Sequence, residues 1–200
     1  MIIKLKNGSP LLRLRRAETG FSLIELIVSL SIITLITVLF MANYKTSNRR
    51  TDLTMTAQKI VADIHLAQNN SLGLVKYNGE VPAGGWGLSF DKTSGTYTMF
   101  ADLNGPGTSG YLDYDPSSEG NVNYGARVTT LSSGVAISSL KLGASYVEGV
   151  NVTFLPPDPQ TNISDAGATS TVLEIQIKET GGTNIKTIRV NFLGLAEVID

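Results

Sequence analysis

The longest apolar run is the feature that most constrains what this chain can fold into. Residues 21–42 read FSLIELIVSLSIITLITVLFMA, in which sixteen of the twenty-two positions are apolar and Glu25 carries the only charge. About twenty helical residues cover a bilayer core of about 30 Å. The sequence therefore predicts a membrane-spanning helix, and we expect its serine and threonine hydroxyls to bond back to the helix itself.

Basic residues lie mainly before this run, and they predict its orientation. The formal net charge is −1, yet the first twenty residues hold five Lys or Arg against one Glu. Lys45, Arg49 and Arg50 follow the run. The positive-inside rule then favours a cytoplasmic N-terminus and an exported remainder.

Neither an ordinary signal peptide nor a plain signal anchor explains all features of this N-terminus. A signal peptide has an apolar stretch of about 7–15 residues and a small-residue cleavage site, whereas this run is longer and ends in bulky residues, Leu39, Phe40 and Met41. A plain anchor leaves Glu25 unexplained, because an ionisable group within a span is costly without a partner. We therefore expect Glu25 to have a function.

Residues 20–25, GFSLIE, lie between the basic leader and the apolar run. This segment closely resembles the processing site of type IV prepilins and type II secretion pseudopilins. The resemblance implies that residues 1–20 are a leader, which a prepilin peptidase removes by cutting between Gly20 and Phe21 before methylating the Phe21 amine. It also implies that Glu25 pairs with the Phe21 amine of a neighbouring subunit during assembly. The chain departs from many family members at position 42, which is alanine rather than proline, and its position 34 is threonine where some pilins have glycine.

Beyond the apolar run, helical periodicity continues to position 72. The apolar stripe recurs at steps of three and four residues and comprises Leu53, Ala57, Ile60, Ile64, Ala67 and Ser71. Asp52, Lys59 and Asp63 are predicted to lie on other faces. Residues 21–72 contain no proline or glycine, so we expect one continuous helix with a membrane and assembly half at 21–42 and an amphipathic half at 43–72. His65 lies beside the stripe and is expected to be a solvated structural residue.

Residues 73–200 predict a β-rich globular head of antiparallel strands. Glycines and prolines punctuate short runs of branched and aromatic residues. The expected strands lie near 86–90, 96–101, 127–140 with an interruption at Gly134, 147–155, 171–178, 185–192 and 195–199. Residues 156–170 are predicted to be an exposed loop, and Trp86 is predicted to be a partly buried core aromatic. With the helix packed on the head, the fold class is α+β and pilin-like.

Several head segments also resemble minor pseudopilin H and the fimbrial T-type minor pilins. They read ADIHLAQNNSL, GGWGLSF, YTMFADLNG, VTFLPP and IRVNFLGLAEVI. The resemblance implies a structural subunit of a type II secretion pseudopilus, a minor pseudopilin acting in filament initiation or at the tip. The alternatives are a minor or major pilin of a type IV pilus and a membrane-anchored binding module that does not polymerise. The implied partners are the prepilin peptidase, other pilin subunits, an inner-membrane assembly platform and membrane lipid, with the head in the periplasm or outside the cell.

One polar segment of the head could hold a hard cation. Its oxygen-bearing side chains alternate along a glycine-rich loop, which suits calcium, and the candidate ligands are Asp102, Asn104, Asp113, Asp115 and Glu119. Pro106 interrupts the spacing of an EF-hand. Turn formation alone also explains Asp-x-Asn-Gly, so both interpretations stay open.

Catalysis and nucleic-acid binding are not expected. The chain has no cysteine and one histidine, and it contains neither a G-x-S-x-G elbow nor a phosphate-binding loop. Residues 51–200 hold eight Lys or Arg against fifteen Asp or Glu, whereas affinity for nucleic acid depends on neutralising phosphates. We therefore expect no enzymatic activity, no cofactor other than the calcium considered above, and no nucleic-acid partner.

Overall fold

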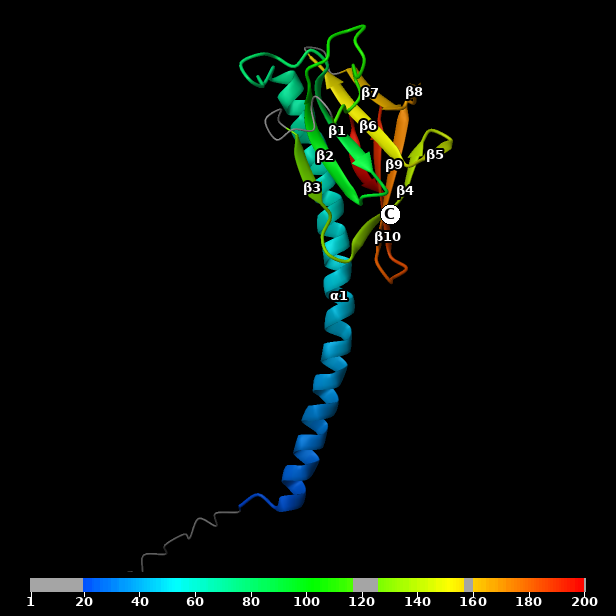
Figure 1. Cartoon of the computed structure of the whole chain (residues 1–200). Helices are drawn as coiled ribbons and strands as arrows, with labels where there is room; N and C mark the ends of the chain where they lie inside the picture. Colours follow the sequence, from blue (N-terminus) through cyan, green and yellow to red (C-terminus); the bar gives the residue numbers. More distant parts are fainter. Residues whose placement is uncertain (1–19, 117–125, 157–159, 200) are drawn as a thin grey trace, which may run out of the picture. The chain divides into compact units, whose positions relative to one another are not determined.

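The protein folds as one long helix followed by a β-rich head. A computed structural model describes residues 20–116, 126–156 and 160–199. Helix α1 (Leu23–Leu72) precedes all of the strands (Figure 1). The chain divides into two compact units, Met1–Tyr44 and Lys45–Asp200, so the second part of α1 belongs to the same unit as the strands. The α+β, pilin-like fold predicted from the sequence is confirmed.

The strands of the head form two antiparallel sheets. Their bounds are β1 (Gly85–Asp91), β2 (Thr96–Asp102), β3 (Arg127–Thr130), β4 (Val135–Leu142), β5 (Ser145–Val147), β6 (Gly149–Leu155), β7 (Gln160–Asp165), β8 (Ala168–Thr169), β9 (Val172–Glu179), β10 (Ile185–Asn191) and β11 (Ala196–Ile199). The first sheet has the order β3-β2-β1-β6-β7-β8 and the second has the order β11-β10-β9-β4-β5. Each strand contributes alternate residues to one face, as in Leu173, Ile175 and Ile177 of β9, which are fully buried.

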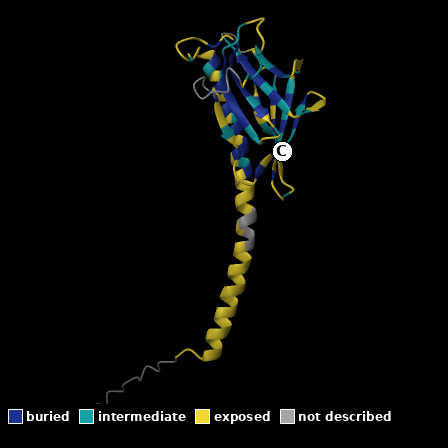
Figure 2. Ribbon diagram, in the orientation of Figure 1, coloured by how far each residue is buried: buried dark blue, intermediate teal, exposed yellow. Residues whose placement is uncertain are grey.

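The apolar stripe of α1 completes the core of the head. All six residues predicted for the stripe are buried, and its five apolar members belong to the same cluster as the inner faces of both sheets. Figure 2 shows this change along the helix, from exposed residues in its first part to a buried face from Leu53 onward. Asp52, Lys59 and His65 are exposed, as predicted, whereas Asp63 is only 8% exposed, so its predicted position away from the head is wrong.

Trp86 connects the end of the helix to the first sheet. Its backbone N–H donates to Ser71 Oγ at 2.8 Å, and its indole Nε1–H donates to the Val75 carbonyl at 3.0 Å. The Tyr77 ring meets it edge-on, with centroids 6.4 Å apart. The indole is 8% exposed, so the predicted core position is confirmed and its polar atom has a partner.

The prediction of a loop over residues 156–170 is wrong. This stretch contains β7, which pairs with β6, and β8, which pairs with β7. Ile163 is the apolar residue of β7 that enters the core, and it is 1% exposed. A strand whose other residues are polar forms here because the backbone hydrogen bonds come from β6, a partner that the local sequence pattern does not reveal.

Two of the predicted strand stretches are each divided between the sheets. Residues 127–140 contain β3 in the first sheet and β4 in the second, separated by a turn in which Gly134 has a φ of +90°, so the predicted interruption at Gly134 is confirmed. Residues 147–155, predicted as one strand, contain the end of β5 in the second sheet and β6 in the first. Glycine tolerates the left-handed backbone that the first of these turns requires.

Candidate processing and assembly site

The segment GFSLIE forms the entry into α1. Helix α1 begins at Leu23, two residues later than predicted, because Ser22 caps it. The Glu25 backbone N–H donates to Ser22 Oγ at 3.2 Å, and the Leu26 N–H donates to the Ser22 carbonyl at 3.2 Å. Serine at the N-cap satisfies helix donors that otherwise lack partners, and Glu25 adds a negative charge in the first turn, where the helix dipole favours it. Ser22 was missed as a cap from the sequence, although Ser-x-x-Glu is a known capping pattern.

Gly20 and Phe21 lie in the exposed residues before the helix. Phe21 is 80% exposed. A Cβ atom added at Gly20 meets no other atom within 4 Å, and the Gly20 φ lies outside the left-handed region. The chain's own conformation therefore does not require glycine at this position.

The first part of α1 presents an apolar surface on every side. Residues Leu23–Met41 are long and apolar enough to cross a membrane, and none of them is buried. The hydroxyls of Ser29, Ser31, Thr34 and Thr37 each donate to the carbonyl four residues earlier, at 2.7–2.8 Å. These bonds confirm the predicted back-bonding and leave the hydroxyls compatible with lipid.

A line of polar contacts fixes the second part of α1 to the head. Arg49, Thr56 and Asp63 are spaced by seven residues, which is about two helical turns, so they lie along one side of the helix. Arg49 Nη1 lies 3.8 Å from Glu179 Oε1, and Thr56 Oγ1 donates to Ser132 Oγ at 3.0 Å. The sequence pattern does not predict this line, because the seven-residue spacing is its one local signal.

Asp63 makes the strongest of these contacts. Its Oδ1 accepts from Arg127 Nη2 at 2.6 Å and its Oδ2 accepts from Tyr97 Oη at 2.6 Å. One carboxylate therefore joins α1 to β2 and β3. Burial, together with the hydrogen bond to Asp63 and its negative charge, raises the pKa of Tyr97.

The described residues predicted to bind calcium take part in hydrogen bonds within the protein. Asp102 is buried at the end of β2, and its two oxygens accept the backbone N–H groups of Asn104 at 2.9 Å and Leu112 at 2.6 Å. Asp113 Oδ1 instead accepts from Asn151 Nδ2 at 2.6 Å. The Asp102 carboxylate thus stabilises the turn, which agrees with turn formation, the second interpretation that the sequence left open.

The other predicted ligands lie elsewhere on the loop. A Cβ atom added at Gly110 would lie 2.7 Å from Asn104 Nδ2 and 3.4 Å from Asp115 Cβ, so these two residues approach the same glycine. Glu119 lies outside the described residues. Among the residues that the structure describes, no three Asp, Glu, His or Cys side chains are arranged to hold a metal ion. The bonds of Asp102 favour turn formation, and calcium binding at this loop stays the alternative interpretation.

The N-terminal segment is where the chain matches known proteins. Residues 15–41 match the family model described as the prokaryotic N-terminal methylation motif. This motif is the prepilin-type cleavage and methylation segment of type IV pilins and pseudopilins, so the predicted resemblance is confirmed. Together with an apolar N-terminal helix that fits a membrane anchor, it supports a type IV pilin-like or pseudopilin subunit. No curated protein and no solved structure matches the chain.

Proposed function

We propose that the chain is a minor pseudopilin, which acts in the initiation or at the tip of a type II secretion pseudopilus. The observation that carries the proposal is the prepilin-type segment at the entry of an apolar helix. The resemblance of several head segments to minor pseudopilin H supports the finer assignment. The subunit has no catalytic role in this proposal.

In the proposed pathway, the chain first waits in the inner membrane with its N-terminus in the cytoplasm. The prepilin peptidase binds the exposed segment around Gly20 and Phe21, removes the leader and methylates the Phe21 amine. The accessibility of this segment supports the step, because Phe21 is 80% exposed and Gly20 has open space beside it. The assembly platform then brings the processed subunit to other pilin subunits.

Glu25 is the residue that the proposal assigns to docking. After cleavage, Glu25 and the Phe21 amine lie about one helical turn apart in lipid, where unpaired charges are costly. An incoming subunit would place Glu25 against the Phe21 amine of its neighbour, which neutralises both charges and sets the axial register.

A substitution pair separates this docking role from helix capping. Glu25→Gln keeps the side-chain shape but removes the charge, so we expect normal insertion and cleavage with loss of incorporation into filaments. Ser22→Ala is the matched control, because it removes the cap bond to the Glu25 N–H and leaves the charge. We expect this variant to be incorporated. Pull-down with the major subunit measures incorporation, and normal incorporation of Glu25→Gln would contradict the docking role of Glu25.

A subunit of a type IV pilus is the second candidate, because the methylation motif is common to both filament classes. The abundance of the protein in sheared surface fibres separates the two. A major pilin dominates such fibres, a minor pilin is present at low level, and a minor pseudopilin is rare or absent. Recovery of the chain as the main component of surface fibres would contradict the proposed role.

A further inference from the structure

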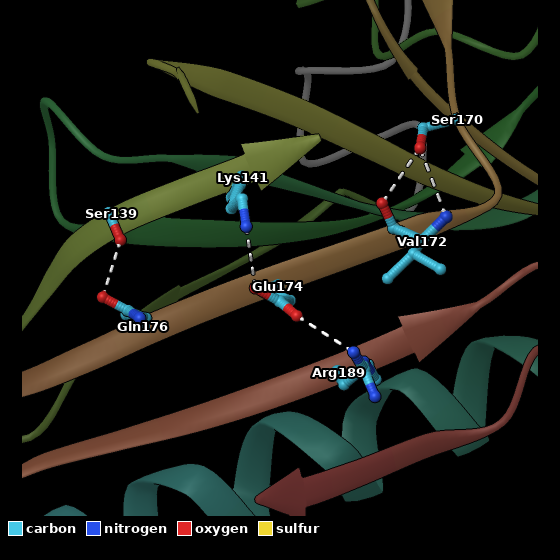
Figure 3. A network of polar contacts seen from close by, with 7 residues as sticks. All are labelled: Ser139, Lys141, Ser170, Val172, Glu174, Gln176 and Arg189. Atoms are coloured by element: carbon cyan, nitrogen blue, oxygen red, sulfur yellow. Dashed lines mark hydrogen bonds and ion pairs between the residues drawn. The ribbon is translucent and has the colours of Figure 1, made fainter. Parts of the chain in front are cut away.

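The outer face of the second sheet carries a row of alternating charges. Glu197, Arg189, Glu174 and Lys141 lie on β11, β10, β9 and β4, and each is the register partner of the next. Tyr146 of β5, 74% exposed, continues the row beside Lys141. Figure 3 shows three of the charged residues joined across the strands, with Arg189 Nη2 3.2 Å and Lys141 Nζ 3.7 Å from Glu174 oxygens. The signs along the row are therefore minus, plus, minus, plus.

This sign pattern is complementary to a second copy of itself that runs in the reversed order. If a second row is laid face to face in reversed order, Glu197 meets Lys141 and Arg189 meets Glu174, so that all four contacts join opposite charges. A twofold axis that lies between β9 and β10 and runs along the strands produces this arrangement. We propose that the outer face of the second sheet is the interface of a homodimer with this symmetry.

The remaining residues of the face are compatible with the same axis. The facing pairs would be Gln176 with Thr187, Ser139 with Ile199, Val172 with Asn191, and Lys178 with Ile185, as given by the strand register. Lys178 is the other charged residue among the outward positions of these strands, and it meets an aliphatic side chain. No like charges face each other across the described part of the interface.

The direction of α1 supports the same axis independently. Arg49 contacts Glu179 at the turn between β9 and β10, and a Cβ atom on Gly194, at the turn between β10 and β11, would lie 2.6 Å from Gln68 Nε2. Within the head, α1 therefore runs in the same direction as β10. An axis along the strands preserves that direction, so the helices of both copies enter from the same side. Two subunits anchored in one membrane must satisfy this condition.

A twofold axis that runs across the strands satisfies neither the charge pairing nor the direction of α1. An axis along the row of charges would place each residue opposite its own copy, so Glu174 would face Glu174 and Arg189 would face Arg189. It would also reverse one helix relative to the other. Charge and direction thus select the same one of the two axes.

We expect this dimer to be weak in solution and to form in the membrane. Four strands at a spacing of about 4.8 Å and a length of about seven residues give roughly 450 Å² per copy, which lies at the low end for protein interfaces. Exposed ion pairs add little energy each and weaken with salt. Anchoring in a common bilayer raises the effective concentration of the two heads. The inference rests on the anchor and does not depend on which filament the subunit enters.

Cross-linking of the full chain in membranes tests the inference directly. The chain has no cysteine, so Thr187→Cys introduces a single thiol beside the proposed axis. Val128→Cys, at a position that is 60% exposed on β3 of the other sheet, is the matched control. In cells without secretion or pilus machinery, we expect a bismaleimide to give a covalent dimer several-fold more abundant for Thr187→Cys, and less of it as salt rises. Equal yields from the two thiols would overturn the proposal, as would a cross-link to a different protein.

A charge exchange distinguishes contact between copies from ion pairing within one copy. In the Thr187→Cys background, Lys141→Glu or Glu197→Lys alone places like charges across the interface and should lower the dimer yield. The two changes together restore opposite charges between copies, although within each copy they leave like neighbours at Glu174 and Arg189. Recovery of the dimer in the double variant supports the interface, and thermal melts verify folding. Failure to recover in a folded double variant, or no effect of either single change, would contradict it.

Discussion

The two parts of helix α1 have the same backbone structure but opposite surroundings. From Leu23 to Met41 every side chain is exposed and most are apolar. From Leu53 to Ser71 the stripe forms one buried face, and exposed side chains such as Gln58, Lys59 and His65 lie elsewhere on the helix. The hydroxyls of the first part bond to their own helix, whereas Thr56 and Ser71 of the second part bond to the head.

This contrast shows how one helix can suit two different environments, lipid and the core of a folded head. The hydroxyls of the first part are bonded within the helix, which suits a lipid environment. The second part contributes both the stripe and the line of polar contacts to the folded head. Because the two parts depend on different surroundings, we expect removal of the first part to leave the head intact and removal of the second part to destroy it.

Truncation should give the largest effect. A chain that begins at Lys45 retains the stripe and the contact between Arg49 and Glu179, so we expect it to be soluble, monomeric at low concentration and cooperatively folded. A chain that begins at Gly73 loses Leu53, Ile60 and Ile64, each worth about 1.5–3 kcal/mol of burial, from a domain whose total stability is about 5–15 kcal/mol. It should unfold or aggregate. Equal thermal melts of the two chains would show that the stripe does not support the head.

A smaller effect is expected from a single polar contact of the second part. Asp63→Ala leaves the buried Tyr97 hydroxyl without its acceptor and removes the partner of Arg127, so we expect a loss of roughly 2–3 kcal/mol in the free energy of unfolding. Denaturant titration of the chain that begins at Lys45 measures it. Asp52→Ala is the matched control on the exposed side of the helix, and it should change stability by less than about 0.5 kcal/mol. Equal effects from the two substitutions would show that Asp63 does not stabilise the contact between the helix and the head.

The smallest effect is expected from calcium. Because both Asp102 oxygens already accept backbone N–H groups, we expect millimolar calcium to leave the Tm of the head unchanged relative to a chelator. A ligand that binds only the native state raises stability by RT ln(1 + [L]/Kd), so thermal melts are sensitive to binding at this loop. A rise in Tm that a chelator reverses, and that Asp115→Ala removes, would favour the calcium interpretation.

The features predicted from the sequence were those with a local signal. The stripe from Leu53 to Ser71 follows from helical periodicity, and the strand containing Leu173, Ile175 and Ile177 follows from alternation. Strand β7 was missed because its backbone partner is β6 and only Ile163 marks it as buried.

The misplacement of Asp63 and the missed charge row have the same cause. Asp63 was placed on an exposed face because its partners, Tyr97 and Arg127, are 34 and 64 positions away in the sequence. The charge row needs four strands in register. At the predicted processing site the situation is reversed, because Gly20, Phe21 and Glu25 lie together in the short segment GFSLIE, within the residues that match the family model.

The central claim is that the N-terminus is processed as a prepilin, and the intact mass of the membrane-extracted protein tests it most directly. Cells that contain a prepilin peptidase should yield residues 21–200 plus one methyl group, and cells that lack the enzyme should yield the full chain. The same mass with and without the peptidase, or a product cut after Ala42, would contradict the account.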